Sequence, residues 1–459
     1  MSYRLRVATV YLLGFFIDLV NMFIANVAYP EIGRHFDAPV SQLAWVSNAY
    51  ILGLTLVIPL SRWLAERFGA KRLFIVALMI FILGSVGVSA SQSILQLIGC
   101  RLLQGIGGGL LIPIGQTMTY ALYRSHERAK LSSAVMLVAL LAPALSPAVG
   151  GLLIESLNWR WVFLASVPLA VVAVVLAAWW LNADTSTVAT ERLDLVGLVS
   201  GCGALTLILL GLTSLGEAQP ANKGVFTLLA GMIVFAGYIG NALNKTQPLL
   251  NLHLMRDPLF QTAMLIYQFV PGIFTGVSML AMLYLQNELG MHAAWVGALM
   301  LPWSIASFIA ITFTGRRFNT LGPRPLFIGG SIIQALGIGL LATTGHSASA
   351  VICVIAFCLM GLGGSLCSST AQSSAFLHIP DKQLADASAI WNINRQLSFC
   401  LGVTLLSLLF NLLLNSGISA DLAFKLCFVL AACTVVLPIL CCLRIANRKV
   451  LLTLNQEKK

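Results

Sequence analysis

Charged side chains are scarce in this sequence. Only 9% of its 459 residues are Asp, Glu, Lys or Arg, whereas 58% are hydrophobic. A soluble globular domain carries about 25% charged residues, so the deficit indicates that most of the chain does not face water. The two or three soluble domains that the length alone would suggest are therefore excluded.

Patterns for metal ligation, disulfide bonding and nucleotide binding are also lacking. The ten cysteines lie in or at the ends of apolar runs, as Cys353 and Cys441 do, without the spacing to histidine that a metal site needs. We interpret them as small buried hydrophobic residues. Residues 105–109 are rich in glycine but lie inside an apolar run, not in a turn between a strand and a helix. The sequence thus predicts no cofactor and no metal, and the six scattered histidines give no sign of a membrane enzyme.

The apolar runs have the length of membrane-spanning helices. About 20 apolar residues cross the hydrocarbon core of a bilayer as a helix. We therefore predict an all-α polytopic membrane protein with fourteen spans, the first of them uncleaved because no small-residue cleavage site follows it. The predicted spans are 8–30, 43–61, 73–93, 95–122, 131–154, 161–181, 195–215, 224–244, 259–286, 295–314, 325–344, 349–373, 387–413 and 422–443.

Basic residues gather in alternate loops, which predicts the orientation. Cytoplasmic loops carry an excess of Lys and Arg, so the richer side is taken as cytoplasmic, with both termini, in a cell (inner or plasma) membrane. The net charge of +11 then reflects topology and not a nucleic-acid partner. We expect a monomer. The richer side holds Arg4, Arg6, Arg67, Lys71, Arg72, Arg124, Arg128, Lys130, Arg316, Arg317, Arg324, Arg448 and Lys449, and the other side holds Arg34, Arg160 and Lys223.

The chain repeats itself at a nearly constant offset. Aligning Gly69 with Gly322, an offset of 253 residues, brings Leu-Phe-Ile into register in both segments; Gly-Ile-Gly-Gly at Gly105 matches Gly-Leu-Gly-Gly at Gly361, an offset of 256. Duplicated halves around a central site are typical of secondary transporters. We predict a six-helix bundle over 1–182, a linker with two additional helices over 183–257, a second six-helix bundle over 258–445 and a cytoplasmic tail over 446–459.

Three charges fall deep inside predicted spans: Asp18, Arg101 and Arg395. Each costs roughly 2.5–3.5 kcal/mol at the bilayer centre, so we expect each to face a water-filled cavity or a partner. Asp18 shares a polar, small-residue stripe with Asn21, and Arg101 shares one with Gln104. We predict that these four residues serve proton coupling or substrate binding. A direct pair between Asp18 and Arg101, a purely structural role for Asp18, and snorkelling of Arg395 to the interface remain open.

The fifth predicted span carries two prolines four residues apart, Pro143 and Pro147, followed by Gly150 and Gly151. Proline removes a backbone donor and bends a helix, and small residues permit close packing. We therefore expect a bent, tightly packed helix between the two halves, where it can act as a joint; a merely kinked structural helix is the alternative.

These motifs resemble those of the major facilitator superfamily, and within it the fourteen-span drug:proton antiporter branch. The resemblance covers nearly the whole chain. The loop 61–72, with Glu66, Gly69 and Arg72, is similar to the cytoplasmic signature of the superfamily. The departures are Arg62 at a usual Gly, Glu66 at a usual Asp, Asn21 at a usual Asp and Ser146 at a usual Gly. Further matches are Arg101, Gln104, Gly105 and Gly108 in the fourth span, Pro143, Pro147, Gly150 and Gly151 in the fifth, and Asn26, Val27, Ala28 and Pro30 in the first.

The resemblance implies two pseudo-symmetric bundles around a central cavity and a proton-coupled secondary transporter. We predict that it exports drugs or lipophilic cations by alternating access, with protons, the small-molecule substrate and the lipid bilayer as its partners. Exporters of a metabolite or siderophore share these features, and an uptake symporter and a passive channel remain alternatives. Asp18 suits a cation, whereas the deep arginines suit an anion. The predicted cavity walls in the second half are Tyr267, Gln268, Ser365, Ser368, Ser369 and Arg395.

Overall fold

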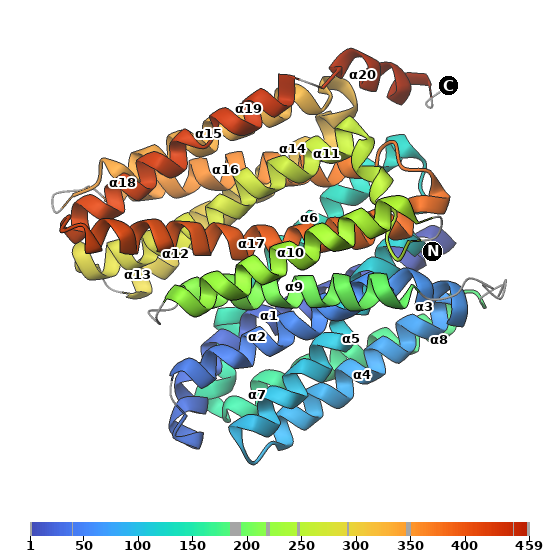
Figure 1. Cartoon of the computed structure of the whole chain (residues 1–459), viewed down its shortest axis with the longest axis horizontal. Coiled ribbons are helices and arrows are strands. Elements are labelled where there is room, and N and C mark those ends of the chain that lie inside the picture. The colour runs from blue at the N-terminus through green and yellow to red at the C-terminus, as the bar shows by residue number, and fades with distance from the viewer. Residues whose placement is uncertain are drawn as a thin grey trace.

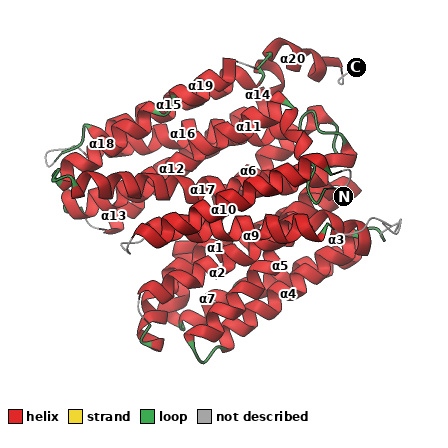
Figure 2. Cartoon of the chain, viewed as in Figure 1, coloured by secondary structure: helices red, strands yellow, loops and turns green. Residues whose placement is uncertain are grey.

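The described part of the chain is helical throughout. A computed structural model describes residues 2–38, 40–183, 194–216, 221–245, 248–291, 293–345, 350–443 and 445–456. Figure 2 shows helices joined by short loops. The helices lie roughly along one direction, and both termini lie at the same end of the molecule, at the right of Figure 1. This end is called the terminal face below.

The first bundle is built from the N-terminal helices. Its α5 packs against α1, α2 and α4, so the glycine-rich helix occupies the interior of the bundle. An added Cβ at Gly105 would meet the carbonyl of Tyr50 on α2, which shows how closely the two backbones approach. The elements are α1 (Tyr3–Phe36), α2 (Val40–Val57), η1 (Ile58–Leu60), α3 (Ser61–Phe68), α4 (Ala70–Ala90), α5 (Ile94–Tyr120), α6 (Ser125–Ser156), α7 (Trp159–Leu164) and α8 (Ser166–Trp180).

A two-helix hairpin lies between the bundles (Figure 1). Its helices, α9 (Leu195–Gly216) and α10 (Ala221–Asn244), pack along each other, and the turn η2 (Leu252–Arg256) follows. The Cys202 thiol donates to the Leu56 carbonyl at 3.2 Å, and the Thr404 hydroxyl donates to the Leu212 carbonyl at 3.1 Å. The hairpin therefore bridges the two bundles.

The second bundle repeats the packing of the first. Gly69 and Gly322 both take positive φ, 88° and 76°, immediately before a helix, a conformation that glycine adopts without strain. Gly361 approaches the Trp303 carbonyl as Gly105 approaches that of Tyr50. The elements are α11 (Pro258–Tyr267), η3 (Gln268–Gly272), α12 (Ile273–Leu283), η4 (Tyr284–Glu288), α13 (Ala293–Ala298), α14 (Met300–Leu321), α15 (Pro323–Ala342), α16 (Ala350–Ala375), η5 (Asp381–Gln383), α17 (Leu384–Asn415), α18 (Ala420–Cys433), α19 (Val436–Leu443) and α20 (Asn447–Gln456).

Twelve helices in the described residues are long and apolar enough to cross a membrane. Two other long helices, α6 and α14, occupy the remaining predicted spans but do not belong to the twelve. The count of fourteen spans, the orientation and the domain limits stay predictions.

Two segments differ from their prediction. Most of the predicted loop 61–72 is the helix α3, in which Arg62 pairs with Glu66 one turn later and only Gly69 breaks the chain direction. The predicted tail contains the helix α20, whose buried Val450 and Leu454 face the core. Both helices are amphipathic and too short to be found by a search for long apolar runs.

Candidate functional site

Asp18 lies in the middle of α1 and is only 1% exposed. The hydroxyl of Tyr50, on α2, donates a hydrogen bond to Asp18 Oδ1, while Oδ2 has no hydrogen-bond partner among the described residues. An added Cβ at Gly108 on α5 would meet the same Oδ1 and the Tyr50 hydroxyl. Three helices thus enclose one carboxylate, and one of its oxygens is available to a proton or a ligand.

Arg101 is fully buried and connects four helices. Its Nε donates to the Val46 carbonyl at 3.0 Å, and its Nη1 donates to Asn21 Oδ1 and to Gln104 Oε1. The Gln104 amide in turn donates to Ser85 on α4 at 2.7 Å. A buried cation is tolerated when polar partners replace its water. Here α1 and α2 each supply one partner, and Gln104 of α5 supplies a third and links the network to α4.

Tyr50 links the carboxylate and the guanidinium. Its hydroxyl holds Asp18, and its ring lies 4.4 Å from Arg101 Cζ; the Phe163 ring lies 5.4 Å from the same atom. Aromatic faces attract cations, most strongly where water is excluded. Asp18, Asn21, Arg101 and Gln104, which the sequence singled out, therefore meet in one buried network, and Tyr50 is the member that was missed.

Arg395 brings a second positive charge from α17. It is 5% exposed, its Cζ lies 5.3 Å from the ring of Phe15 on α1, and its Nη2 has no hydrogen-bond partner among the described residues. Phe15 is one turn from Asp18 on α1, so Arg395 brings its positive charge to the stretch of α1 that carries the carboxylate. The interpretation that Arg395 snorkels to the interface is wrong, because its side chain is buried between the bundles.

The other cavity candidates of the second half lie on two stretches of helix, Tyr267 and Gln268 at the junction of α11 and η3, and Ser365, Ser368 and Ser369 on α16. Gln268, the first residue of the π-helical turn η3, donates to Asn394 Oδ1 at 2.8 Å, whereas Tyr267 packs its ring against Trp391 at 5.1 Å. Ser368 donates to the Gly364 carbonyl of its own helix, and Ser365 is buried on the same helix. Ser369 instead lies 3.5 Å from Ser133 of α6, so it contributes to the contact between bundles.

At the terminal face an ion pair joins the bundles. Arg62 Nη1 of α3 lies 2.8 Å from Asp386 Oδ2 in the first turn of α17, and Arg62 Nε lies 2.8 Å from Glu66. Glu66 therefore binds within its own helix and orients Arg62, which is the residue that reaches across to the second bundle. Arg72, in contrast, is exposed at the start of α4.

Further contacts between the bundles lie beside this pair. Arg128 Nη1 donates to the Phe376 carbonyl at 2.8 Å, and its Nη2 lies 2.7 Å from Asp381. Deeper in the molecule, Gln116 Oε1 accepts from Ser388 at 2.6 Å and from Asn392 at 3.0 Å. These groups join the two bundles over the half of the molecule nearest the terminal face.

Among the acidic groups at this end, Glu127 has a pKa below its usual value. Burial raises the pKa of Glu127, but hydrogen bonds from the Arg124 amide and the Arg4 guanidinium outweigh that effect and hold it below its usual value. Glu127 therefore stays ionised and ties the start of α1 to the start of α6.

The helix α6 runs unbroken through the predicted joint. Its Ser146 donates to the Ala142 carbonyl at 2.6 Å and lies 3.5 Å from the Val20 carbonyl of α1, and Gly150 is buried. The close packing expected at Gly151 is absent, because no described atom lies within 4 Å of an added Cβ. The side chains of three predicted residues lie outside the described ones: Asn26, Pro143 and Pro147.

The comparisons with known proteins agree with this architecture. The family model described as Major Facilitator Superfamily matches residues 11–403. The lincomycin resistance protein LmrB of Listeria monocytogenes is 26% identical over 85% of this chain and 83% of its own length. The putative multidrug resistance protein MdtD of Yersinia enterocolitica is 27% identical over 93% and 92%. The solved proton:xylose symporter XylE has a TM-score of 0.67 at 15% identity, over 96% of this chain and 95% of that one, which shows the fold alone.

Proposed function

Because the chain belongs to the Major Facilitator Superfamily, we propose that it is a proton-coupled transporter that exports small lipophilic molecules, drugs or lipophilic cations, by alternating access. The resistance named in the relatives LmrB and MdtD supports export. In this proposal the chain spans the cell (inner or plasma) membrane fourteen times, with its termini in the cytoplasm. The observation that carries proton coupling is the enclosed carboxylate of Asp18.

The proposed coupling works through charge between the bundles. An ionised Asp18 on α1 attracts Arg395 on α17, because the Arg395 guanidinium lies over the ring of Phe15, one turn from Asp18. Protonation removes that attraction and leaves the contact between α1 and α17 weaker. A proton on Asp18 and a cation beside it also exclude each other, since both neutralise the same charge. Proton uptake can therefore accompany substrate release on one side, and the reverse can occur on the other.

The contacts at the terminal face provide the second half of the cycle. Arg62–Asp386 and Arg128–Asp381 hold the bundles together on the side assigned to the cytoplasm. Breaking them and rocking the bundles apart would open the site inward. For an uncharged substrate, a proton crossing 100 mV releases about 2.3 kcal/mol, which supports roughly fifty-fold accumulation before any pH gradient is counted. Exchange of one proton for one monovalent cation moves no net charge, so the pH gradient alone drives it.

The test is transport of the lipophilic cation tetraphenylphosphonium in energised inverted vesicles. We expect accumulation with the unmodified chain and its loss with Asp18→Asn, which keeps the size of the side chain and removes the ionisable group. Asp37→Asn is the matched control: it lies at the end of the same helix with φ 48°, a conformation that Asn tolerates. Undiminished accumulation with Asp18→Asn would reject the coupling role.

A further inference from the structure

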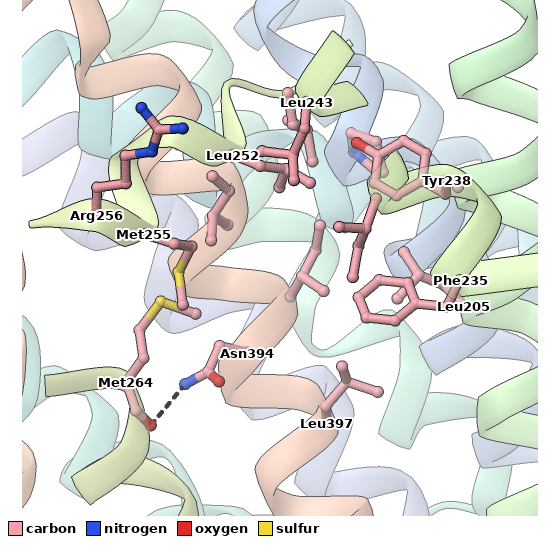
Figure 3. A pocket seen from close by; sticks show the side chains of 16 residues that line it. Leu205, Phe235, Tyr238, Leu243, Leu252, Met255, Arg256, Met264, Asn394 and Leu397 are labelled. Atoms are coloured by element: carbon pink, nitrogen blue, oxygen red, sulfur yellow. Dashed lines mark hydrogen bonds between the residues drawn. The ribbon is translucent and has the colours of Figure 1, made fainter. Parts of the chain in front are cut away.

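A pocket of about 570 Å³ lies between the hairpin and the second bundle, away from the Asp18 network. Its walls come from α9, α10, η2, α11 and α17, and most of its lining is apolar. Figure 3 shows Met255 and Arg256 on one side and Phe235 and Tyr238 on the other, with Leu397 at the opposite end of the pocket from Leu243. The size is that of a pocket for a small organic ligand or a single lipid chain.

The pocket has a polar end and an apolar end. Tyr238 is 4% exposed, and its hydroxyl has no hydrogen-bond partner among the described residues. Its ring is held in place by α9, where an added Cβ at Gly201 would lie 3.3 Å from Cε2. A buried, unpaired hydroxyl is costly, so an acceptor supplied by a ligand would stabilise it. Asn394 does not supply this acceptor, because its amide donates to the Met264 carbonyl and its Oδ1 already accepts from Gln268.

Arg256 lies at the rim of this polar end. Its side chain is exposed, and no ion pair joins it to a described residue. It ends η2, immediately before the membrane-crossing stretch that begins at Pro258. A basic residue just before a membrane-crossing helix lies at the level of the lipid headgroups, where it can bind an anionic one.

The outer side of α10 is apolar and exposed. Phe226, Leu229, Met232 and Ile233 of this helix are 50–73% exposed and apolar, as expected of a surface that faces lipid chains. The helix therefore faces lipid chains along its outer side, and Leu243, which lines the pocket near the end of α10, is itself 42% exposed.

From these observations we infer that the pocket is a binding site for an anionic glycerophospholipid, which seats one acyl chain between α10 and α17. The phosphate lies at Arg256, and an ester carbonyl accepts the hydrogen bond of Tyr238. Such a lipid ties the hairpin to the second bundle. The inference does not depend on what is transported or in which direction.

The test uses the purified full chain in lipid nanodiscs with two photoactivatable lipids, phosphatidylglycerol and phosphatidylcholine, that carry the same diazirine acyl chain. Peptide mass spectrometry then locates the labelled residues. We expect labelling of residues 235–243 and 390–397, with phosphatidylglycerol preferred roughly fivefold, the value that about 1 kcal/mol per basic residue near an anionic lipid surface gives. Excess unlabelled phosphatidylglycerol should compete.

Two variants separate the headgroup from the chain. Arg256→Gln should abolish the preference for phosphatidylglycerol, whereas Arg317→Gln, an exposed arginine at the same end, should keep it. Leu397→Trp should lower labelling by both lipids, whereas Leu405→Trp, on the lipid-facing side of α17, should not. Equal labelling by both lipids on the unmodified chain, or labelling without competition, would overturn the inference even if Leu397→Trp fails to fold.

Discussion

A single carboxylate is enclosed where α1, α2 and α5 meet, and the residues around it determine what it can do. Tyr50 binds one oxygen of Asp18 and stacks beneath Arg101, so the acid and the base share one intermediary. Asn21, which lies one turn after Asp18 on α1, accepts a hydrogen bond from Arg101 of α5. A change in the charge of Asp18 therefore acts on a network that reaches four helices.

Substitution of Gly108 tests how tightly Asp18 is enclosed, because alanine adds only one methyl group. Gly108→Ala places a Cβ against Asp18 Oδ1 and the Tyr50 hydroxyl, so we expect the hydrogen bond between them to be displaced. Overpacking of this kind costs about 1–3 kcal/mol, and we expect a lower unfolding temperature together with at least a tenfold loss of transport.

Gly99→Ala, on the same helix, is the control. Nothing described lies within 4 Å of its added Cβ, and alanine is the better helix former. Its unfolding temperature and transport should be unchanged or slightly higher. Equal behaviour of the two variants in thermal unfolding and transport would contradict the enclosure of Asp18.

At this scale the sequence identified charged residues well and their partners poorly. Asp18, Arg101 and Arg395 stand out because charge is expensive inside a membrane. Tyr50 does not, since a tyrosine in an apolar span has the pattern of ordinary packing until its hydroxyl is placed beside a carboxylate. Asp386 was missed because it lies at the end of a predicted span, where acidic residues are common and give no sign of a function. In the structure its side chain is buried.

At the scale of elements, α3 and the start of α17 form the ion pair that joins the bundles at the terminal face. Asp386 is 2% exposed and lies in the first turn of α17, where a helix N-terminus favours an anion. Arg62 is held toward it by Glu66. The arginine of this pair, Arg62, stands where the resembling family usually has a glycine.

We expect Arg62→Gln and Asp386→Asn each to loosen the terminal face, since each leaves a partly buried charge without its partner. Hydrogen exchange of α3 and of residues 376–386 should become faster in either variant. The double variant should be less perturbed than the sum of the two, with a coupling of about 0.5–3 kcal/mol.

Arg67→Gln is the matched control for this pair. Arg67 is exposed on the same helix and lies over the Trp63 ring, without reaching the second bundle. Its substitution should leave exchange in residues 376–386 unchanged. Strict additivity of Arg62→Gln and Asp386→Asn would show that the pair does not join the bundles.

Long apolar helices could be predicted from the sequence, whereas breaks within them could not. The run 259–286 contains the π-helical turns η3 and η4, and 161–181 is divided at Ala165. Membrane helices tolerate such breaks because neighbouring helices supply the displaced hydrogen bonds. Apolar composition alone carries no sign of where that support lies.

For the whole molecule, the repeat in the sequence corresponds to a repeat in the fold. Gly69 and Gly322 take the same conformation, and Gly105 and Gly361 make the same close approach. The halves nevertheless differ in chemistry: Arg101 is a fully buried base on α5 of the first, whereas Phe357 stands at the corresponding place in the second. One bundle therefore carries the acid–base network, and the other brings Arg395 to it.

The most direct test of this account is proton movement driven by substrate. Proteoliposomes that hold the purified chain and an entrapped pH dye, with no gradient imposed, receive tetraphenylphosphonium on one side. The account predicts that protons move opposite to the cation with the unmodified chain and with Asp37→Asn, and that this movement disappears with Asp18→Asn. Cation transport without proton movement, or equal proton movement with Asp18→Asn, would contradict it.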